Sequence, residues 1–198
     1  MLYFGNILSS ARLATMAAVI SASMISGFSA ASFAEGIPLS DRLDRLFTEL
    51  QSSESEMEAK RIAAQIDNLW RGARGETARL LLTRADDAIA DEDFPLALDV
   101  LDQLIALEPD FAEAWNRRAT VYFLKNEYGP SLADIAVTLT LEPRHFGALT
   151  GLGLMLEDLG DDERAYAALK RALELNPFQE EVRLELESLE RSALGQPI

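Results

Sequence analysis

The segments LEPDF (107–111), LEPRHF (141–146) and LNPF (175–178) place a proline at the same point of three similar stretches. Pro109, Pro143 and Pro177 are spaced 34 residues apart. Because proline cannot continue a helix and disfavours helical backbone in the residue before it, each segment predicts the end of a helix. The constant spacing indicates that the chain contains repeated units.

The residues upstream of each proline repeat the same chemistry. Small residues stand twelve and twenty-four positions before it, and large apolar residues stand eight and twenty-eight positions before it. The small residues are Ala97, Ser131 and Ala165, then Ala85, Ala119 and Gly153. The large ones are Leu101, Ile135 and Leu169, then Leu81, Trp115 and Leu149. This spacing predicts two helices in each unit, joined by the polar turns ADED (90–93), KNEYG (125–129) and LGDD (159–162).

This pattern resembles the tetratricopeptide repeat family over about residues 76–179. The third unit fits best, through Leu149, Leu152, Gly153, Leu156, Ala165, Leu169, Ala172 and Pro177. The second unit departs from the family at Ser131 and Thr138, and the first departs at Arg84 and Leu104. The resemblance implies an all-α fold, a right-handed superhelical solenoid of helix–turn–helix repeats at about 78–111, 112–145 and 146–179.

The two ends of this domain (76–198) differ from the repeats. Residues 35–75 predict a helical hairpin with the stripes Leu39, Leu43, Leu46, Phe47, Leu50 and Ile62, Ile66, Leu69, Trp70. Ser53 and Glu56 predict a capping box at the start of the second helix. The hairpin is either a degenerate repeat or a cap that shields the end of the solenoid. Residues 180–194 predict an amphipathic helix that caps the other end.

Residues 1–34 predict a cleavable signal peptide. They contain no acid and one base, Arg12, followed by an apolar run and by Ser32 and Ala34 at the −3 and −1 positions of a cleavage site. Cleavage before Glu35 makes the chain periplasmic or secreted. The alternative is an uncleaved segment that anchors the chain, and only then does the protein contact a membrane.

Composition excludes several classes of function. The net charge of −15 disfavours nucleic acid and anionic membrane surfaces. The chain has no cysteine and one histidine, so thiolate chemistry, sulfur-ligated metals and histidine-rich metal sites are excluded. Nucleophile elbows, phosphate loops and dinucleotide fingerprints are absent from the sequence. We therefore expect neither an enzyme nor a cofactor or metal, and we expect His145, which follows Pro143, to be a surface or turn residue.

Arg118 stands in a position where the third repeat has Leu152. Sixteen residues further, Asp134 stands where the third repeat has Ala168, so a polar pair in one unit replaces an apolar pair in the other. Because a partly buried arginine needs a partner, this predicts an ion pair between Arg118 and Asp134. Arg84 occupies the same position of the first repeat, and the sequence does not decide its partner.

The resemblance implies that function resides on a concave surface lined by the first helix of each repeat. The expected groove residues are Leu82, Asp86, Ile89, Asn116, Thr120, Phe123, Thr150, Leu154 and Glu157. Members that bind chaperones hold a C-terminal carboxylate with lysine, arginine and asparagine at these positions, of which only Asn116 is present.

This mixed apolar and acidic groove suits a protein or peptide partner, either an amphipathic helix or an extended segment with basic flanks. The function expected is a periplasmic module that holds part of an envelope protein. One alternative is that the terminal helices cover the groove. Another is a structural scaffold that self-associates through its end helices, with no ligand in the groove.

Overall fold

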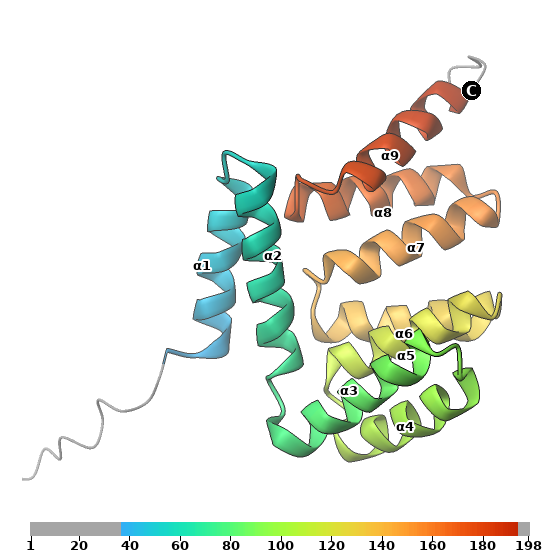
Figure 1. Cartoon of the computed structure of the whole chain (residues 1–198). Helices are drawn as coiled ribbons and strands as arrows, with labels where there is room; N and C mark the ends of the chain where they lie inside the picture. Colours follow the sequence, from blue (N-terminus) through green and yellow to red (C-terminus); the bar gives the residue numbers. More distant parts are fainter. Residues whose placement is uncertain (1–36, 194–198) are drawn as a thin grey trace, which may run out of the picture. The chain divides into compact units, whose positions relative to one another are not determined.

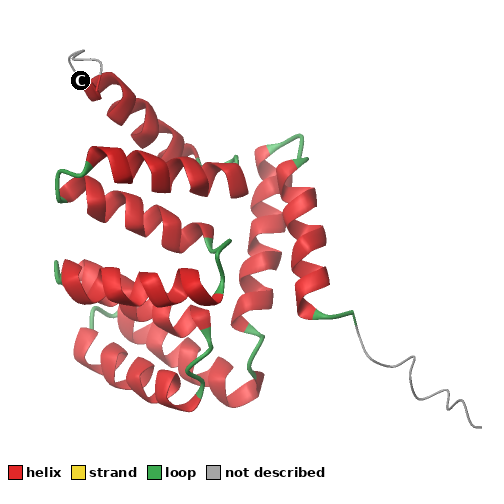
Figure 2. Cartoon of the chain, turned by 180° about the vertical axis from the view of Figure 1, so that it is seen from behind, coloured by secondary structure: helices red, strands yellow, loops and turns green. Residues whose placement is uncertain are grey.

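The computed structural model describes residues 37–193 as nine helices joined by short loops, with no strand in this range (Figures 1 and 2). The helices are α1 (Leu39–Gln51), α2 (Glu56–Arg71), α3 (Gly75–Ala90), α4 (Phe94–Leu107), α5 (Ala112–Leu124), α6 (Tyr128–Leu141), α7 (Phe146–Asp158), α8 (Asp162–Leu175) and α9 (Glu180–Ala193). Among the described helices, none combines the length and the apolar character needed to cross a bilayer. The expected signal peptide lies outside the described residues.

Three helical pairs form the repeats, and they confirm the all-α solenoid expected from the sequence. The pairs are α3–α4, α5–α6 and α7–α8. Each second helix ends two residues before its proline, at Leu107, Leu141 and Leu175. The small residues of each pair are fully buried or nearly so. A side chain added at Gly153 would place Cβ 2.5 Å from Leu169 Cγ, so only glycine fits where α7 and α8 approach this closely.

The turns inside the repeats share one unusual backbone conformation. Glu92, Asn126 and Gly160 have φ values of 59°, 59° and 75°, and they stand 34 residues apart. In each turn the backbone N–H of the following residue bonds to a carbonyl of the preceding helix, at 2.8 Å from Asp93 to Ala88, from Glu127 to Tyr122 and from Asp161 to Leu156. The left-handed residue therefore reverses the chain and satisfies a free carbonyl at the helix end.

The Arg118–Asp134 ion pair is confirmed. Arg118 Nε lies 2.7 Å from Asp134 Oδ2 and Nη2 lies 2.8 Å from Oδ1, a bidentate contact between α5 and α6. Arg118 Nη1 also donates to Asp102 of α4 at 2.6 Å, and its guanidinium lies 4.9 Å from the centre of the Trp115 ring. These hydrogen bonds raise the pKa of Arg118 despite its partial burial. Arg84, by contrast, is exposed.

The helical hairpin α1–α2 does not continue the stack of repeats on the α3–α4 side. It runs beside the stack, where α6 and α8 end and α5 and α7 begin (Figure 1). Its apolar face shares one core with the third repeat and α9, including Phe47, Ile66, Leu169 and Val182. The hairpin is therefore neither an additional repeat nor a cap on the first repeat.

The predicted start of α2 is displaced by two residues. Ser55, not Ser53, precedes the helix, and its side chain accepts a hydrogen bond from the Glu58 backbone N–H at 3.3 Å. Ser53 Oγ instead donates to the Leu50 carbonyl oxygen at the end of α1. The sequence SSESEME contains two overlapping serine–glutamate pairs with capping-box spacing, so spacing alone does not choose between them.

Candidate functional site

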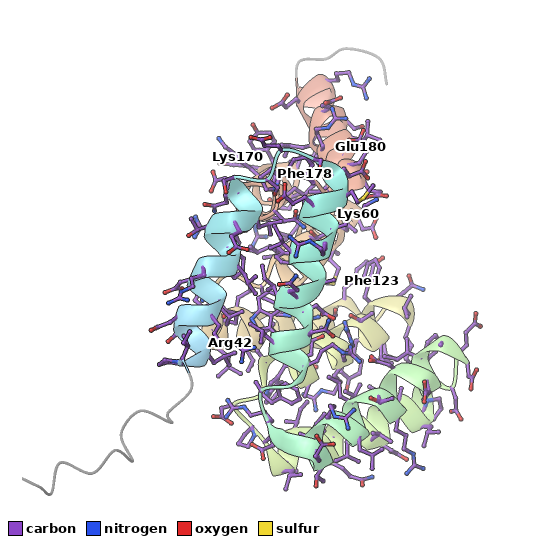
Figure 3. All side chains as sticks on the ribbon, turned by 60° about the vertical axis from the view of Figure 1, so that its left-hand side comes forward. Arg42, Lys60, Phe123, Lys170, Phe178 and Glu180 are labelled. Atoms are coloured by element: carbon purple, nitrogen blue, oxygen red, sulfur yellow. The ribbon has the colours of Figure 1, made fainter. Side chains whose placement is uncertain are left out.

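A groove lies between α5 and α7, and five of the nine residues expected from the sequence line it. These are Asn116, Thr120, Phe123, Thr150 and Leu154. Ser131 and Ile135 of α6 form its floor, and Gly147, Gly151 and Met155 complete the α7 wall. Its volume is about 230 Å³, enough for one large side chain, and its lining is mainly apolar. We call it the α5–α7 groove. In Figure 3, Phe123 and Arg42 of α1 lie on opposite sides of α2.

The other expected residues do not line this groove. Leu82 is 1% exposed and belongs to the core of the first repeat, and Ile89 packs against the same core. Asp86 is bonded to Arg71 of α2 and to Arg117 Nε, the latter at 2.9 Å. The expectation that all nine residues face one open surface is therefore wrong for these three. Ion pairs with α2 close the α3 side, while the α5–α7 part stays open among the described residues.

Asn116 supplies a polar group at the wall of this groove. The residue is 8% exposed, and its carboxamide makes no hydrogen bond to a described residue, although its polar atoms are not closed off from solvent. Its backbone carbonyl accepts from the Thr120 hydroxyl at 3.0 Å, which fixes the local helix geometry. Because this amide lines the groove and is not used by another side chain, its donor and its acceptor are both available to a ligand.

Two carboxyl groups lie beyond the apolar part of the groove. Glu157 of α7 is one helical turn after Leu154, and Glu185 of α9 lies close to it. Burial and the neighbouring Glu185 carboxyl raise the pKa of Glu157 to about 7. Near neutral pH the two carboxyl groups are therefore protonated in a fraction of the molecules. A bound ammonium or guanidinium group would favour loss of this proton, because its positive charge stabilises both carboxylates.

Phe123 and Thr150 are held in place by neighbouring side chains. The Phe123 ring stacks on Tyr128, with ring centres 5.9 Å apart and planes inclined by 20°. Tyr128 donates to Asp158 at 2.7 Å, and this hydrogen bond raises the pKa of the phenol. Thr150 donates to Gln179 at 3.3 Å, so the α8–α9 connection borders the groove.

Sequence reasoning missed a buried polar cluster where α2 meets α5 and the start of α7. His145, expected to be a surface or turn residue, does stand in the turn before α7, but it is 4% exposed and stacks on Trp70 of α2, with ring centres 4.5 Å apart. Its Nε2 lies 2.9 Å from Oε2 of Glu113, which is 1% exposed. Glu113 Oε1 lies 2.8 Å from Arg117 Nη2, although the two are not aligned for a hydrogen bond.

The hydrogen bonds assign the tautomer of His145. The backbone N–H of Ala148 donates to Nδ1 at 3.1 Å, so Nδ1 carries no proton and His145 caps the N-terminus of α7. Nε2 must then donate to Glu113. Burial opposes ionisation of Glu113, but the His145 hydrogen bond and the Arg117 charge outweigh it and lower the pKa of this carboxyl. Both ring nitrogens of His145 are occupied, so the pair anchors the hairpin instead of exchanging protons with a ligand.

One signal in the sequence could have revealed this cluster. Glu113 and Arg117 occupy the positions at which the third repeat has Gly147 and Gly151. Arg117 pairs with Asp67 of α2 and with Glu113, whereas the two glycines line the open α5–α7 groove. The pair of positions that closes the inner surface on the α3 side of α5 therefore opens it between α5 and α7, because it holds charged residues in α5 and glycines in α7.

Comparisons with known proteins agree with this architecture. Residues 82–136 and residues 146–179 each match the tetratricopeptide repeat family. A TPR repeat-containing protein of Rhizobium etli is 42% identical over 152 residues, which cover 75% of this chain and 74% of that protein.

Two solved structures are similar in fold. The first TPR domain of Spaghetti (RPAP3), bound to the HSP90 peptide SRMEEVD, gives a TM-score of 0.57 at 20% identity and covers 59% of this chain and 93% of that one. The Sgt2 TPR domain from Aspergillus fumigatus gives 0.56 at 19% identity and covers 63% and 87%. With the repeat period, the paired helices and these matches, the chain belongs to the tetratricopeptide repeat family, whose repeats serve in general as protein–protein interaction modules.

Proposed function

We propose that this chain is an exported interaction module that holds a segment of an envelope protein in its α5–α7 groove. The observation that carries the proposal is that the Asn116 carboxamide, which bonds to no described residue, lines the same groove as the Phe123 side chain. A bound polypeptide would supply a backbone N–H and C=O to the amide and an apolar side chain to the groove. The groove volume of about 230 Å³ favours one large apolar anchor over a whole helix face.

The chemistry of the groove limits the ligand further. Its lining contains no lysine or arginine, so it lacks the cations that grip a terminal carboxylate in the chaperone-binding members. Glu157 and Glu185 lie beyond Leu154 and favour a basic residue of the ligand next to its apolar anchor. We therefore propose an internal segment that pairs an apolar side chain with a lysine or arginine.

Export rests on the sequence of residues 1–34 alone. Mature protein recovered from the periplasm, or from the medium, is expected to begin near Glu35, as terminal sequencing by mass spectrometry would establish. Soluble cytoplasmic protein that retains Met1 contradicts this part of the proposal and leaves the groove unaffected.

The groove is tested by capture from envelope extract with the mature protein as bait. Phe123→Ala combined with Asn116→Ala should abolish capture, since aromatic anchors in central pockets contribute about 2 kcal/mol or more to binding. Because Phe123 also packs on Tyr128, a small loss of stability is expected, but the circular dichroism spectrum should not change. Leu80→Ala, at an exposed leucine of α3 outside the groove, is the matched control and should capture normally. Undiminished capture by the double variant contradicts the proposal.

A further inference from the structure

A second groove opens on the opposite face of α7, between α6 and α8. Its volume is about 570 Å³, more than twice the 230 Å³ of the α5–α7 groove. The apolar lining consists of Leu132, Leu149, Leu152, Leu156, Leu159, Ala167 and Ala168. Leu159 is 55% exposed, so a leucine at the end of this groove is left in water. We call it the α6–α8 groove.

The preceding repeat shows what normally fills this position. There Arg118 stands where Leu152 does, and its guanidinium bridges Asp102 of α4 and Asp134 of α6. The residues equivalent to these aspartates are Ala136 and Ala168. In the preceding repeat an arginine side chain and two carboxylates fill this place. In the α6–α8 groove the three equivalent residues are a leucine and two alanines. The replacement leaves apolar surface open to an occupant.

The outer face of α6 extends this apolar surface. Its exposed residues are Gly129, Pro130, Ala133, Ala136, Thr140 and Leu141, none of them charged. The only charged residue of α6 is Asp134, which is buried against Arg118. The outer face of α4 carries Asp99 and Asp102, and that of α8 carries six charged residues. An uncharged exposed helix in a chain with 26% charged residues is typical of an interaction surface.

Charge is present on one wall only. Arg164 and Arg171, both on α8, line the groove and are the only charged residues that do so. Each has one carboxylate partner close in sequence: Asp161, which precedes α8, for Arg164, and Glu174 of α8 for Arg171. Since a guanidinium has five N–H donors, both arginines retain donors for an acidic group. The groove therefore complements an apolar stripe flanked on one side by carboxylates.

We propose that the α6–α8 groove binds an amphipathic helix of a partner protein, with leucine-like side chains on one face and acidic residues along one edge. The leucine face enters the groove over Leu152, and the acidic edge lies against Arg164 and Arg171. This ligand differs from the basic-flanked segment proposed for the α5–α7 groove. The two grooves lie on opposite faces of α7, so the two ligands bind independently.

Two synthetic helical peptides test the chemistry of the occupant. Both carry leucine on one face, and they differ only in having glutamate or lysine at the flanking positions. In fluorescence anisotropy titrations at low salt, the glutamate peptide should bind the mature protein about tenfold more tightly than the lysine peptide. Equal affinity, or preference for the lysine peptide, overturns the proposal, because the net negative charge of the protein would by itself favour the lysine peptide.

A variant that copies the preceding repeat tests the location. Leu152→Arg, Ala136→Asp and Ala168→Asp together install the triad formed by Arg118, Asp102 and Asp134, so the fold is expected to be kept. Circular dichroism should confirm this, and binding of the glutamate peptide should fall at least about tenfold. Phe123→Ala with Asn116→Ala should leave that binding unchanged. Retained binding by the filled variant, or loss in the Phe123 and Asn116 variant, overturns the assignment to this groove.

Charge reversal tests the arginine wall without altering the apolar lining. Arg164→Glu with Arg171→Glu should reverse the order of the two peptides, and an unchanged order contradicts the proposed orientation. Sedimentation of the parent over a range of concentrations examines the other occupant, a second copy of the chain. A monomer at every concentration agrees with the proposal. Self-association that the filled variant abolishes makes a second copy the occupant and overturns it.

Discussion

At the scale of single residues, Arg118 shows how one position is used differently in successive repeats. Its guanidinium is held by two carboxylates and lies over Trp115, so the charge is compensated where it is partly buried. The sequence predicted the Asp134 partner because the polar residues replace an apolar pair at the same spacing. Asp102 was not predicted, although Ala136 stands in its place 34 residues further, because the prediction compared only the two helices within one repeat.

Removing Arg118 alone should destabilise the fold more than replacing the whole triad. Arg118→Ala leaves Asp134 buried without a partner and is expected to cost about 3 kcal/mol in the free energy of unfolding. Arg118→Leu with Asp102→Ala and Asp134→Ala copies Leu152, Ala136 and Ala168, and should cost less than about 1 kcal/mol. Urea denaturation measures both. Equal losses would mean that the ion pair contributes nothing beyond the packing of the side chains.

Glu157 should make stability depend on pH in a defined direction. Its pKa is raised from 4.5 to about 7, so the folded chain binds this proton more tightly than the unfolded chain. The resulting stabilisation is complete below pH 4.5 and is lost as pH rises towards about 7. Glu157→Gln should therefore be more stable than the parent at about pH 8, by about 1 kcal/mol after allowance for solvent screening, and nearly equal at about pH 4. An unchanged difference between the two pH values contradicts the shared proton.

At the scale of elements, the repeat period explains most of the helices. Proline at a fixed position ends α4, α6 and α8, and small residues at fixed positions set how closely each pair approaches. Both are local signals, so the sequence alone predicted them. The start of α2 was misplaced because two serines compete for the same role, and only the packing of the hairpin selects Ser55.

The turns offer a matched test of this local control. Glu92 and Gly160 occupy equivalent positions with left-handed backbone. In the folded state this conformation destabilises a residue with a side chain by about 1 kcal/mol, whereas glycine adopts it without strain. Gly160→Ala should therefore lower the free energy of unfolding by about 1 kcal/mol. Glu92→Gly should raise it by less than this amount, because glycine gains conformational freedom in the unfolded chain. Thermal melting measures both changes. A stabilised Gly160→Ala would show that the turn adopts another conformation.

At the scale of the whole described molecule, the hairpin determines which part of the inner surface is open. Trp70, Arg71 and Asp67 of α2 contact His145, Asp86 and Arg117, which are 75, 15 and 50 residues away in sequence. These contacts between α2 and the repeats do not recur with the 34-residue period, so the repeat pattern gives no sign of them. The sequence therefore did not predict the ion pairs of Asp86 or the burial of His145. The five residues of the α5–α7 groove were predictable because they follow the repeat period.

Occupation of the α5–α7 groove by a partner can be examined by site-specific photocrosslinking in the exporting cell. A photoreactive side chain is placed at Thr150, which lines the groove, or at Thr83, which is exposed on α3 and outside both grooves. We expect one partner to be crosslinked from Thr150 and not from Thr83, and we expect Phe123→Ala with Asn116→Ala to remove this product. Crosslinking from Thr83 alone, or a Thr150 product that survives the double substitution, would contradict occupation of this groove.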